Sequence, residues 1–408
     1  MQCRFCKTEL TNVFIDLVNS PASNSFLSEE QLQEPENYYP LKVYTCHQCY
    51  LVQVDEYKKS DAIFDSNYVY FSSYSSSWLQ HARTYTEIMT NRFGYNINSL
   101  VIEVASNDGY LLQYFKEQNI PVLGIEPTAN TAAAAKEKGV DSVVDFFGVR
   151  LAKELVAKNI KADLLLGNNV LAHVPDIIDF VGGMKIILRE TGVVTMEFPH
   201  LMQLVDNNQF DTIYHEHFSY LSFHTVKQIF ESQGLEMFDV EEILTHGGSL
   251  RIFAKHPANR DLSISPNVAT LLDKEQQKGL TSLSYYDNFQ QKALKVKLDF
   301  TSFLIEQKNA GKKVAAYGAA AKGNTLLNYC GIKNDLINFV VDANPHKQNK
   351  YLPGSHIPVV NEMYLKEAKP DYVIIFPWNI KDEITLQLAY IRDWGGKFVT
   401  AVPDLQIV

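Results

Sequence analysis

Short apolar runs alternate with longer amphipathic stretches along most of this chain. Between residues 81 and 255, four runs end near Val104, Ile125, Leu166 and Met196, and each has the length of a buried strand. Strands that alternate with helices predict a parallel sheet covered on both faces. The pattern resumes over 313–317, 337–341 and 372–376, after a polar helical stretch from about 266 to 310. The sequence therefore predicts an α/β protein with two Rossmann-like domains.

The first 60 residues differ from this pattern, because they show little helical periodicity and carry four of the five cysteines. A stretch rich in serine and tyrosine follows. We therefore divide the chain into a small N-terminal module over 1–60, a connector or active-site loop over 61–80, a first α/β domain over 81–265, and a helical linker with a second α/β domain over 266–408.

Composition excludes several classes of protein. The 408 residues are 46% hydrophobic and 21% charged, which is typical of globular chains and not of disordered or fibrous ones. The formal net charge is −10, so general binding to nucleic acid or to an anionic membrane is disfavoured. No apolar run reaches the roughly 18–20 residues that span a bilayer, and the N-terminus lacks a signal-peptide core. We expect a cytoplasmic protein without a membrane or nucleic-acid partner.

The N-terminal cysteines form two Cys-x-x-Cys pairs, Cys3 with Cys6 and Cys46 with Cys49. In a reducing compartment such pairs favour metal over disulfide. Four thiolates in a tetrahedron suit zinc, and the closed ligand shell makes the site structural. The alternatives are unligated thiols or a redox pair.

The most informative local signal is the polar loop after the first strand of the α/β domain. It runs from Glu103 through Ala105, Ser106, Asn107 and Asp108 to Gly109 and opens a helix. A dinucleotide fingerprint needs three glycines, and this loop has one. A ligand without phosphates fits better, and S-adenosyl-L-methionine (SAM) is such a ligand. Glu103 and Asp108 are suited to its cationic end, and backbone N–H groups of the turn to its carboxylate.

The next strand ends carry further polar groups at the same predicted sheet edge. Glu126 is placed to accept the two ribose hydroxyls, and Asp145 and Phe146 to hold and stack the adenine. The fourth strand ends in a polar segment. From it we select Asn168, Asn169 and His173. The series predicts a SAM site, with a dinucleotide as the alternative.

A second cluster of ionisable groups is the stretch Tyr214-His215-Glu216-His217. An imidazole is a natural general base near neutral pH, and a tyrosine hydroxyl can stabilise an oxyanion. A metal site or a polar surface turn are the alternatives. Downstream, a predicted hairpin turn brings His246 and Arg251 toward the opening of the same site.

The second α/β domain opens with a strand followed by Gly318-Ala319-Ala320-Ala321-Lys322-Gly323-Asn324. Asn324 stands where a P-loop requires lysine, which disfavours an NTPase. The helix N-terminus with Lys322 is still suited to a diphosphate. The alternative is a domain that only buttresses the cleft.

Together these motifs resemble those of the sugar C-methyltransferases that act on nucleotide-linked 4-keto deoxyhexoses. The resemblance rests on the cysteine pairs, the segment 103–109, the segment 214–217, the turn 246–249 and the segment 318–326, and it spans almost the whole chain. It implies a SAM-dependent enzyme that removes a proton beside a ketone and methylates the resulting enolate carbon, in the synthesis of branched deoxysugars. The expected substrate carries dTDP, and the expected state is a monomer or weak homo-oligomer.

The resemblance also implies residue roles. His217 is the base, and Tyr214 and Glu216 position the sugar and stabilise the enolate. Tyr70 and Tyr74 close over the sugar. The expected substrate-binding residues are Tyr74, His215, His246, Arg251, Lys322 and Asn324. The competing functions are an NAD-dependent nucleotide-sugar oxidoreductase and a non-catalytic nucleotide-sugar scaffold.

Overall fold

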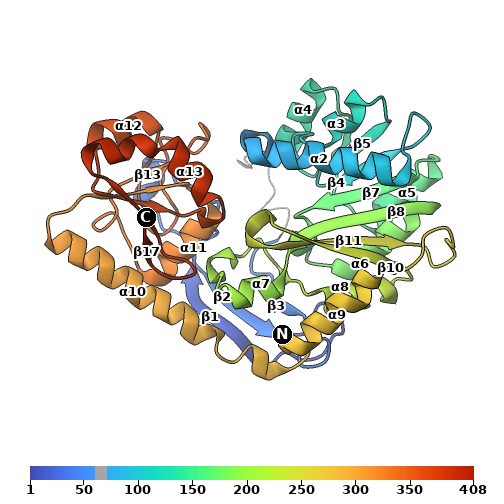
Figure 1. Ribbon diagram of the computed structural model, residues 1–408, viewed down its shortest axis with the longest axis horizontal. Helices are drawn as coiled ribbons and strands as arrows, with labels where there is room; N and C mark the ends of the chain where they lie inside the picture. The colour runs from blue at the N-terminus through green and yellow to red at the C-terminus, as the bar shows by residue number, and fades with distance from the viewer. Residues whose placement is uncertain (60–70) are drawn as a thin grey trace.

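The computed structural model describes residues 1–59 and 71–408 and contains three sheets (Figure 1). Two lobes rise from a base that contains the N-terminal strands and the long helix α10 (Phe289–Asn309). The predicted fold class, a zinc module with two Rossmann-like domains, is confirmed. Within the described residues, none of the helices combines the length and the apolar character that a membrane span requires.

The N-terminal sheet includes a strand from the middle of the chain. β1 (Asn12–Ser20), β2 (Tyr39–Thr45) and β3 (Val52–Val54) form an antiparallel meander. β9 (Ser219–Tyr220) pairs antiparallel with β3. The stretch 214–217 comes directly before β9, so it is anchored on the N-terminal module.

The central domain has a seven-stranded sheet in the order β10-β11-β8-β7-β4-β5-β6. Five strands run parallel, and β10 and β11 are antiparallel to their neighbours. Their bounds are β4 (Val101–Val104), β5 (Val122–Ile125), β6 (Ser142–Val143), β7 (Ala162–Asn168), β8 (Leu188–Pro199), β10 (Glu236–Ile243) and β11 (Ser249–Lys255). The strand order reverses at β4, and ligands of such sheets bind in the crevice at that point.

Helices cover both faces of this sheet, as the apolar runs predict. They are α2 (Ser76–Phe93), α3 (Leu112–Glu117), α4 (Ala129–Glu137), α5 (Val149–Ala157), α6 (Ile177–Ile187) and α8 (Phe223–Ser232). Helix α7 (Leu201–Asp206) packs instead in the core with the N-terminal strands and α10. Neighbouring strand residues face opposite cores, because side chains alternate along a strand. Leu164 packs with Tyr85 and Phe115 in one core, while Leu165 packs with Phe180 and Phe230 in the other.

The predicted helical stretch over 266–310 is two helices. α9 (Pro266–Lys278) ends at Gly279, whose left-handed conformation terminates it, and α10 follows. The C-terminal sheet has the order β14-β13-β12-β15-β16-β17 and is parallel except for β17. Its elements are β12 (Val314–Tyr317), α11 (Ala321–Cys330), β13 (Val340–Val341), β14 (Val359–Val360), α12 (Glu362–Ala368), β15 (Tyr372–Ile375), α13 (Lys381–Gln387), β16 (Lys397–Thr400) and β17 (Gln406–Ile407).

The N-terminal module packs against both lobes. Phe14 of β1 stacks on Phe289 of α10 with ring centroids 4.5 Å apart, within a core that continues into the C-terminal sheet. Cys3, Cys46 and Leu51 join the core beneath the central sheet instead. The module therefore fixes the base from which the two lobes rise.

Candidate active site

The four N-terminal cysteines converge as their spacing predicts. Their sulfurs lie within 4.8 Å of one another, with Cys3 and Cys49 3.6 Å apart and Cys6 and Cys46 3.5 Å apart. A tetrahedron with Zn–S bonds of about 2.3 Å has edges of about 3.8 Å. The observed separations fit that shape closely. Gln53 donates to the Cys3 sulfur at 3.2 Å and so supports this ligand from outside the cluster.

The turn between Cys3 and Cys6 also contacts the segment that carries His217. Arg4, between Cys3 and Cys6, donates to the carbonyl oxygens of Val54 and Pro175. Its guanidinium lies 5.4 Å from the centroid of the Phe218 ring. Phe218 adjoins His217, so zinc binding at this turn supports the segment that carries the candidate base.

The loop after β4 uses unusual backbone conformations in place of a glycine-rich sequence. Ala105, Asn107 and Gly109 have positive φ angles of 56°, 50° and 72°. A β-carbon at Gly109 would lie 3.2 Å from that of Ala135, so only this position combines a left-handed backbone with a close approach by α4. The sharp turn leaves its first residues at the carboxyl edge of β4, beside the strand-order reversal.

Glu126, at the end of β5, holds this loop in place. Its carboxylate accepts the backbone N–H of Asn107 and of Thr128, each at 2.9 Å, and the Thr128 hydroxyl. Both oxygens still have further lone pairs. Glu126 is thus a loop-positioning group as well as the predicted ribose acceptor.

Glu103 is fully buried, and the Tyr110 hydroxyl is the one hydrogen-bonding group within residues 1–59 and 71–408 that stabilises its carboxylate. Burial, with the charges of Glu126 and Asp108, raises the pKa of Glu103 well above its usual value. A cationic ligand group nearby would reverse this effect. The site therefore fits the cationic end of SAM, as the sequence predicts for Glu103.

The other predicted cofactor residues differ in how accessible their side chains are to a ligand. Asp108 is bound by Lys138 at 2.9 Å, which leaves it less available to a ligand, and Ser106 is fully buried beneath the loop. Asp145 accepts a bidentate contact from Arg150 at 2.7 and 2.8 Å. Phe146 is 42% exposed, which leaves its ring open to a planar group.

Asn168 and Asn169 stand at the carboxyl end of β7. Asn168 is buried, and neither its oxygen nor its amide nitrogen has a hydrogen-bond partner in the described part of the chain. Such unsatisfied groups point to a bound polar ligand. The Asn169 side-chain nitrogen lies 3.5 Å from His246 Nε2, which brings the turn at 245–247 to the same edge.

His217 has the geometry of a general base. Its Nδ1 donates to the Thr212 carbonyl oxygen at 2.9 Å, so in the neutral ring the Nε2 lone pair is available. Burial lowers the pKa of His217 well below its usual value, and the charges of His173, His246 and Lys322 lower it further. The imidazole is therefore neutral at pH 7.

The residues around His217 differ in what they contact. The ring centroids of Tyr214 and His173 lie 4.0 and 4.6 Å from that of His217, so His173 belongs to this cluster as well as to the end of β7. Burial lowers the pKa of His173 to about 4. Glu216 accepts the Asn24 amide at 2.8 and 2.9 Å, and burial raises its pKa to about 7.

His215 and Asn324 lie against the N-terminal module. His215 Nε2 donates to the Pro40 carbonyl oxygen at 3.2 Å, and its ring meets Tyr39 edge-on. The Asn324 amide donates to the Ser23 carbonyl oxygen at 2.5 Å. Both side chains thus join the module to the rest of the site, although the sequence places them on the substrate.

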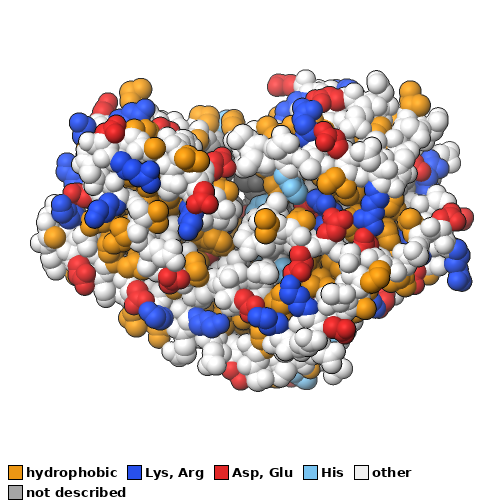
Figure 2. All heavy atoms as spheres, viewed as in Figure 1, with side chains coloured by type: hydrophobic (Ala, Val, Ile, Leu, Met, Phe, Trp, Pro, Cys, Tyr) orange, Lys and Arg blue, Asp and Glu red, His pale blue; other side chains and the backbone are white. Residues whose placement is uncertain are grey.

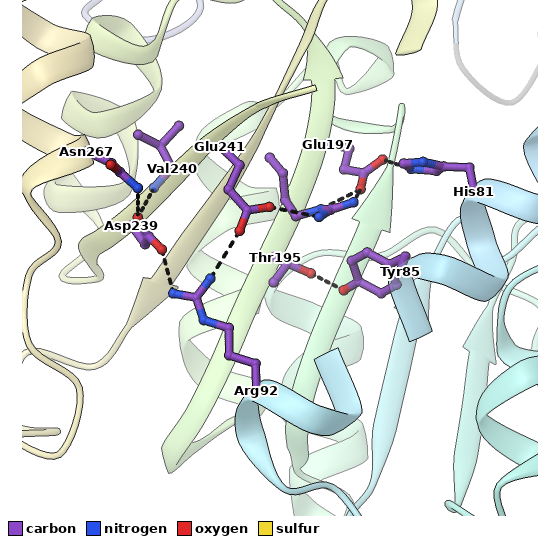
Figure 3. Close-up of polar contacts among 10 residues, drawn as sticks. His81, Tyr85, Arg92, Thr195, Glu197, Asp239, Val240, Glu241 and Asn267 are labelled. Atoms are coloured by element: carbon purple, nitrogen blue, oxygen red, sulfur yellow. Dashed lines mark hydrogen bonds and ion pairs between the residues drawn. The ribbon is translucent and has the colours of Figure 1, made fainter. Parts of the chain in front are cut away.

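Arg251 corrects the sequence interpretation. Its guanidinium is buried and binds Glu197 at 2.7 Å and Glu241 at 2.8 Å (Figure 3). Glu197 also binds His81 of α2 at 2.7 Å. Arg251 therefore belongs to an internal ion-pair network across β8, β11 and α2, and it is not a free anion-binding group. Sequence reasoning missed Glu197 and His81, which lie far apart along the chain.

Lys322 faces the histidine cluster from the opposite lobe. It stands in the first turn of α11, and its charge lowers the pKa of both His217 and His246. Figure 2 shows histidine side chains inside the hollow between the two lobes. Tyr74 is 55% exposed and lies 6.3 Å from His346 of the C-terminal lobe, between ring centroids. Tyr70 lies outside the described residues.

Three family models match the chain in succession. They are described as "Putative zinc binding domain" over residues 3–64, "Methyltransferase domain" over 77–240 and "C-methyltransferase C-terminal domain" over 244–403. The C-methyltransferase NovU of Streptomyces niveus is 32% identical over 407 residues, which cover 100% of this chain and 96% of NovU. The chain belongs to this C-methyltransferase family. It is a SAM-dependent methyltransferase with a zinc module, and the oxidoreductase and scaffold alternatives are set aside.

Solved structures resemble part of this chain at low sequence identity. The SAM-bound magnesium protoporphyrin IX methyltransferase of Synechocystis PCC 6803 is 12% identical, with a TM-score of 0.33, over 44% of this chain and 79% of that chain. The PH0226 protein of Pyrococcus horikoshii OT3 is 13% identical, with a TM-score of 0.38, over 46% and 95%.

Proposed function

We propose that this methyltransferase acts on a nucleotide-linked 4-keto deoxysugar and methylates the carbon beside the ketone through an enolate. The observation that carries the proposal is the orientation of His217. Its Nδ1–H is bound by a carbonyl oxygen at 2.9 Å, while its neighbours keep the ring neutral. A neutral imidazole with a fixed tautomer is suited to taking a proton from carbon.

The low pKa of His217 requires help from its surroundings. Each unit of lowered pKa weakens the base by about 1.4 kcal/mol. The proton transfer therefore needs groups that stabilise the negative oxygen of the enolate. Tyr214 lies against the His217 ring, and Lys322 brings a positive charge from the opposite lobe. Electrostatic stabilisation of this kind is commonly the largest contribution to catalysis.

Glu216 positions the sugar in this proposal. Its carboxylate is held by the Asn24 amide and is buried. With a pKa of about 7, it can accept or donate a hydrogen bond to a sugar hydroxyl at neutral pH. Tyr70 and Tyr74 are proposed to cover the sugar, and His246 to contact it.

The cofactor-binding residues follow the carboxyl edge of the central sheet. SAM, when bound, supplies an electrophilic methyl group on its sulfonium. The buried Glu103 carboxylate is suited to its cationic end, the unsatisfied Asn168 amide to a polar group, and Glu126 to its ribose. Asp145 and Phe146 are proposed to bind the adenine, with the backbone of 105–109 at the carboxylate. Asn169 and His173 are proposed to complete the SAM site on the side nearest His217.

Lys322 is the proposed contact for the nucleotide diphosphate, with dTDP as the expected nucleotide. Its ammonium donates to Asn379 Oδ1 at 2.6 Å, and an anionic ligand would offset the burial that lowers the pKa of Lys322. The proposed biological role is the synthesis of branched deoxysugars, by a monomer or a weak homo-oligomer.

The direct test uses methyl-labelled SAM with a panel of dTDP- and UDP-linked 4-keto sugars. We expect labelled product from a dTDP-linked 4-keto deoxysugar in the native protein. His217→Asn should reduce turnover by about 10²–10⁴-fold, the contribution of a general base, and should keep its affinity for SAM. His224→Ala, which alters a histidine on α8, is the control and should keep full turnover. Unchanged transfer by His217→Asn would contradict the assignment.

A further inference from the structure

Trp378 of the C-terminal lobe makes a direct contact with the central domain. Its indole Nε1 donates to Asp211 Oδ2 at 2.7 Å. Asp211 is buried and belongs to the short helix η4 (Phe210–Thr212). The hydrogen bond therefore joins the C-terminal lobe to the segment that precedes the candidate base, and Thr325 of α11 also donates to the Ile213 carbonyl oxygen of that segment at 2.8 Å.

The turn that carries His246 is shaped around the same indole. Gly247 has a φ of 86°, and a β-carbon there would lie 2.5 Å from the Trp378 ring and 2.7 Å from Gln209 Nε2. Gln209 Nε2 also donates to the Gly247 carbonyl oxygen at 2.7 Å. Any side chain at this position would separate the turn from Trp378, so glycine is required for the contact.

Trp378 also positions Lys322. The Lys322 ammonium lies 4.5 Å from the centroid of the Trp378 ring, a cation–π contact, and donates to Asn379 Oδ1 at 2.6 Å. Asp211 attracts the same ammonium at longer range. Three groups thus fix the direction of a lysine that faces the histidine cluster.

Asp211 connects this arrangement to the candidate base. The next residue, Thr212, provides the carbonyl oxygen that binds His217 Nδ1. The Asp211 carboxylate is buried, and the Trp378 indole is its side-chain hydrogen-bond partner. The short helix η4 therefore carries both the carbonyl oxygen that orients His217 and the carboxylate that binds Trp378.

We propose that Asp211 and Trp378 are positioning residues, which hold Lys322 toward the substrate diphosphate and set the distance between that lysine and His217. The inference rests on the proposed function, because it assumes a diphosphate substrate. It extends that function by making the contact between the lobes a part of substrate binding.

The test compares Trp378→Phe with a matched control. Trp394→Phe also removes an indole hydrogen bond within the C-terminal lobe, to the Pro370 carbonyl oxygen at 3.0 Å, and does not involve Lys322. We expect Trp378→Phe to weaken dTDP binding about tenfold, because a charge-assisted contact loses its fixed direction. Its affinity for SAM should stay within about twofold, and Trp394→Phe should match the native protein in both titrations.

A second variant separates the hydrogen bond from the charge. Asp211→Asn keeps an acceptor oxygen for the indole and removes the negative charge. The protein has three tryptophans, so its ¹⁵N spectrum has three indole signals. Asp211→Asn should shift the Trp378 signal and leave that of Trp394 in place, and it should raise the KM for the keto-sugar more than it lowers kcat.

The outcomes separate the two proposals. Equal dTDP affinities for Trp378→Phe and Trp394→Phe, or an equal loss of SAM and dTDP binding in Trp378→Phe, would overturn the positioning role. Failure of the native protein to bind dTDP would overturn it as well. If the variants behave as expected while no keto-sugar is methylated, the positioning role stands and the proposed reaction is wrong.

Discussion

Substitution of Arg251 by methionine tests whether this residue is structural, as its contacts indicate, or binds substrate, as the sequence suggests. The change keeps an apolar stem against Tyr85 but removes the guanidinium that binds Glu197 and leaves His81 in contact with this buried carboxylate. Removal of one member of a buried ion pair costs about 3–5 kcal/mol. At about 2–4 °C for each kcal/mol in a domain of this size, the unfolding midpoint should fall by roughly 6–20 °C.

The pH dependence of this loss provides a second check. Burial opposes ionisation of Glu197, but His81 and Arg251 outweigh burial and hold its pKa below the usual value. In the native protein this carboxylate adds stability above its unfolded pKa, and that stability is lost as the pH falls through the folded pKa. Without Arg251, burial raises the folded pKa, so Glu197 can take up a proton. The loss of unfolding free energy in Arg251→Met should therefore become smaller as the pH falls from neutral toward the unfolded pKa of a glutamate.

The assay is differential scanning calorimetry of the full chain, with dTDP titrations well below the unfolding midpoint. Arg189→Met is the control, because Arg189 lies on β8, the strand that carries Glu197, and its side chain is exposed where it contacts Asp163. We expect the control to keep its midpoint. An unchanged unfolding midpoint in Arg251→Met, together with a raised KM for the substrate, would refute the structural role and would indicate that Arg251 binds the substrate.

Three further predictions concern other parts of the molecule. Cys49→Ser should bind less than one zinc ion per chain, as metal analysis would show, and should unfold at lower temperature because metal binding supplies folding free energy. Glu126→Gln should weaken SAM binding about tenfold in calorimetric titration, since hydrogen bonds to a charged acceptor are lost; equal affinity would contradict its role. Glu275→Ala should destabilise the protein by about 3–5 kcal/mol in denaturant unfolding. The Glu275 carboxylate binds His200 and the backbone N–H of Phe223, each at 2.7 Å; full stability of this variant would refute the estimate.

The sequence predicted the positions of polar groups along the central sheet better than their partners. Glu103, Glu126 and Asn168 follow buried strands, and parallel strands bring their carboxyl ends to one edge, so local patterns were sufficient. The partner of Arg251 could not be predicted, because Glu197 is 54 residues away and only the register of β8 and β11 brings them together.

Two other features had no local signal. β9 has two residues and therefore no measurable periodicity, yet its pairing with β3 attaches the segment 214–217 to the N-terminal module. Trp378 and Asp211 are 167 residues apart along the chain, and neither occurs in a motif. Gly247 was the one visible sign of the contact, since a His-Gly-Gly turn indicates a backbone that must pass close to something.

Exchange of solvent deuterium into a dTDP-linked 4-keto deoxysugar, without SAM, shows whether His217 is the base that removes a proton from the sugar. The mass of the sugar is followed in heavy water with the native protein, His217→Asn and the control His224→Ala. We expect one deuterium beside the ketone with the native protein and the control, and a rate about 10²–10⁴-fold lower with His217→Asn. Equal exchange by His217→Asn and the native protein would contradict the assignment of His217 as the base.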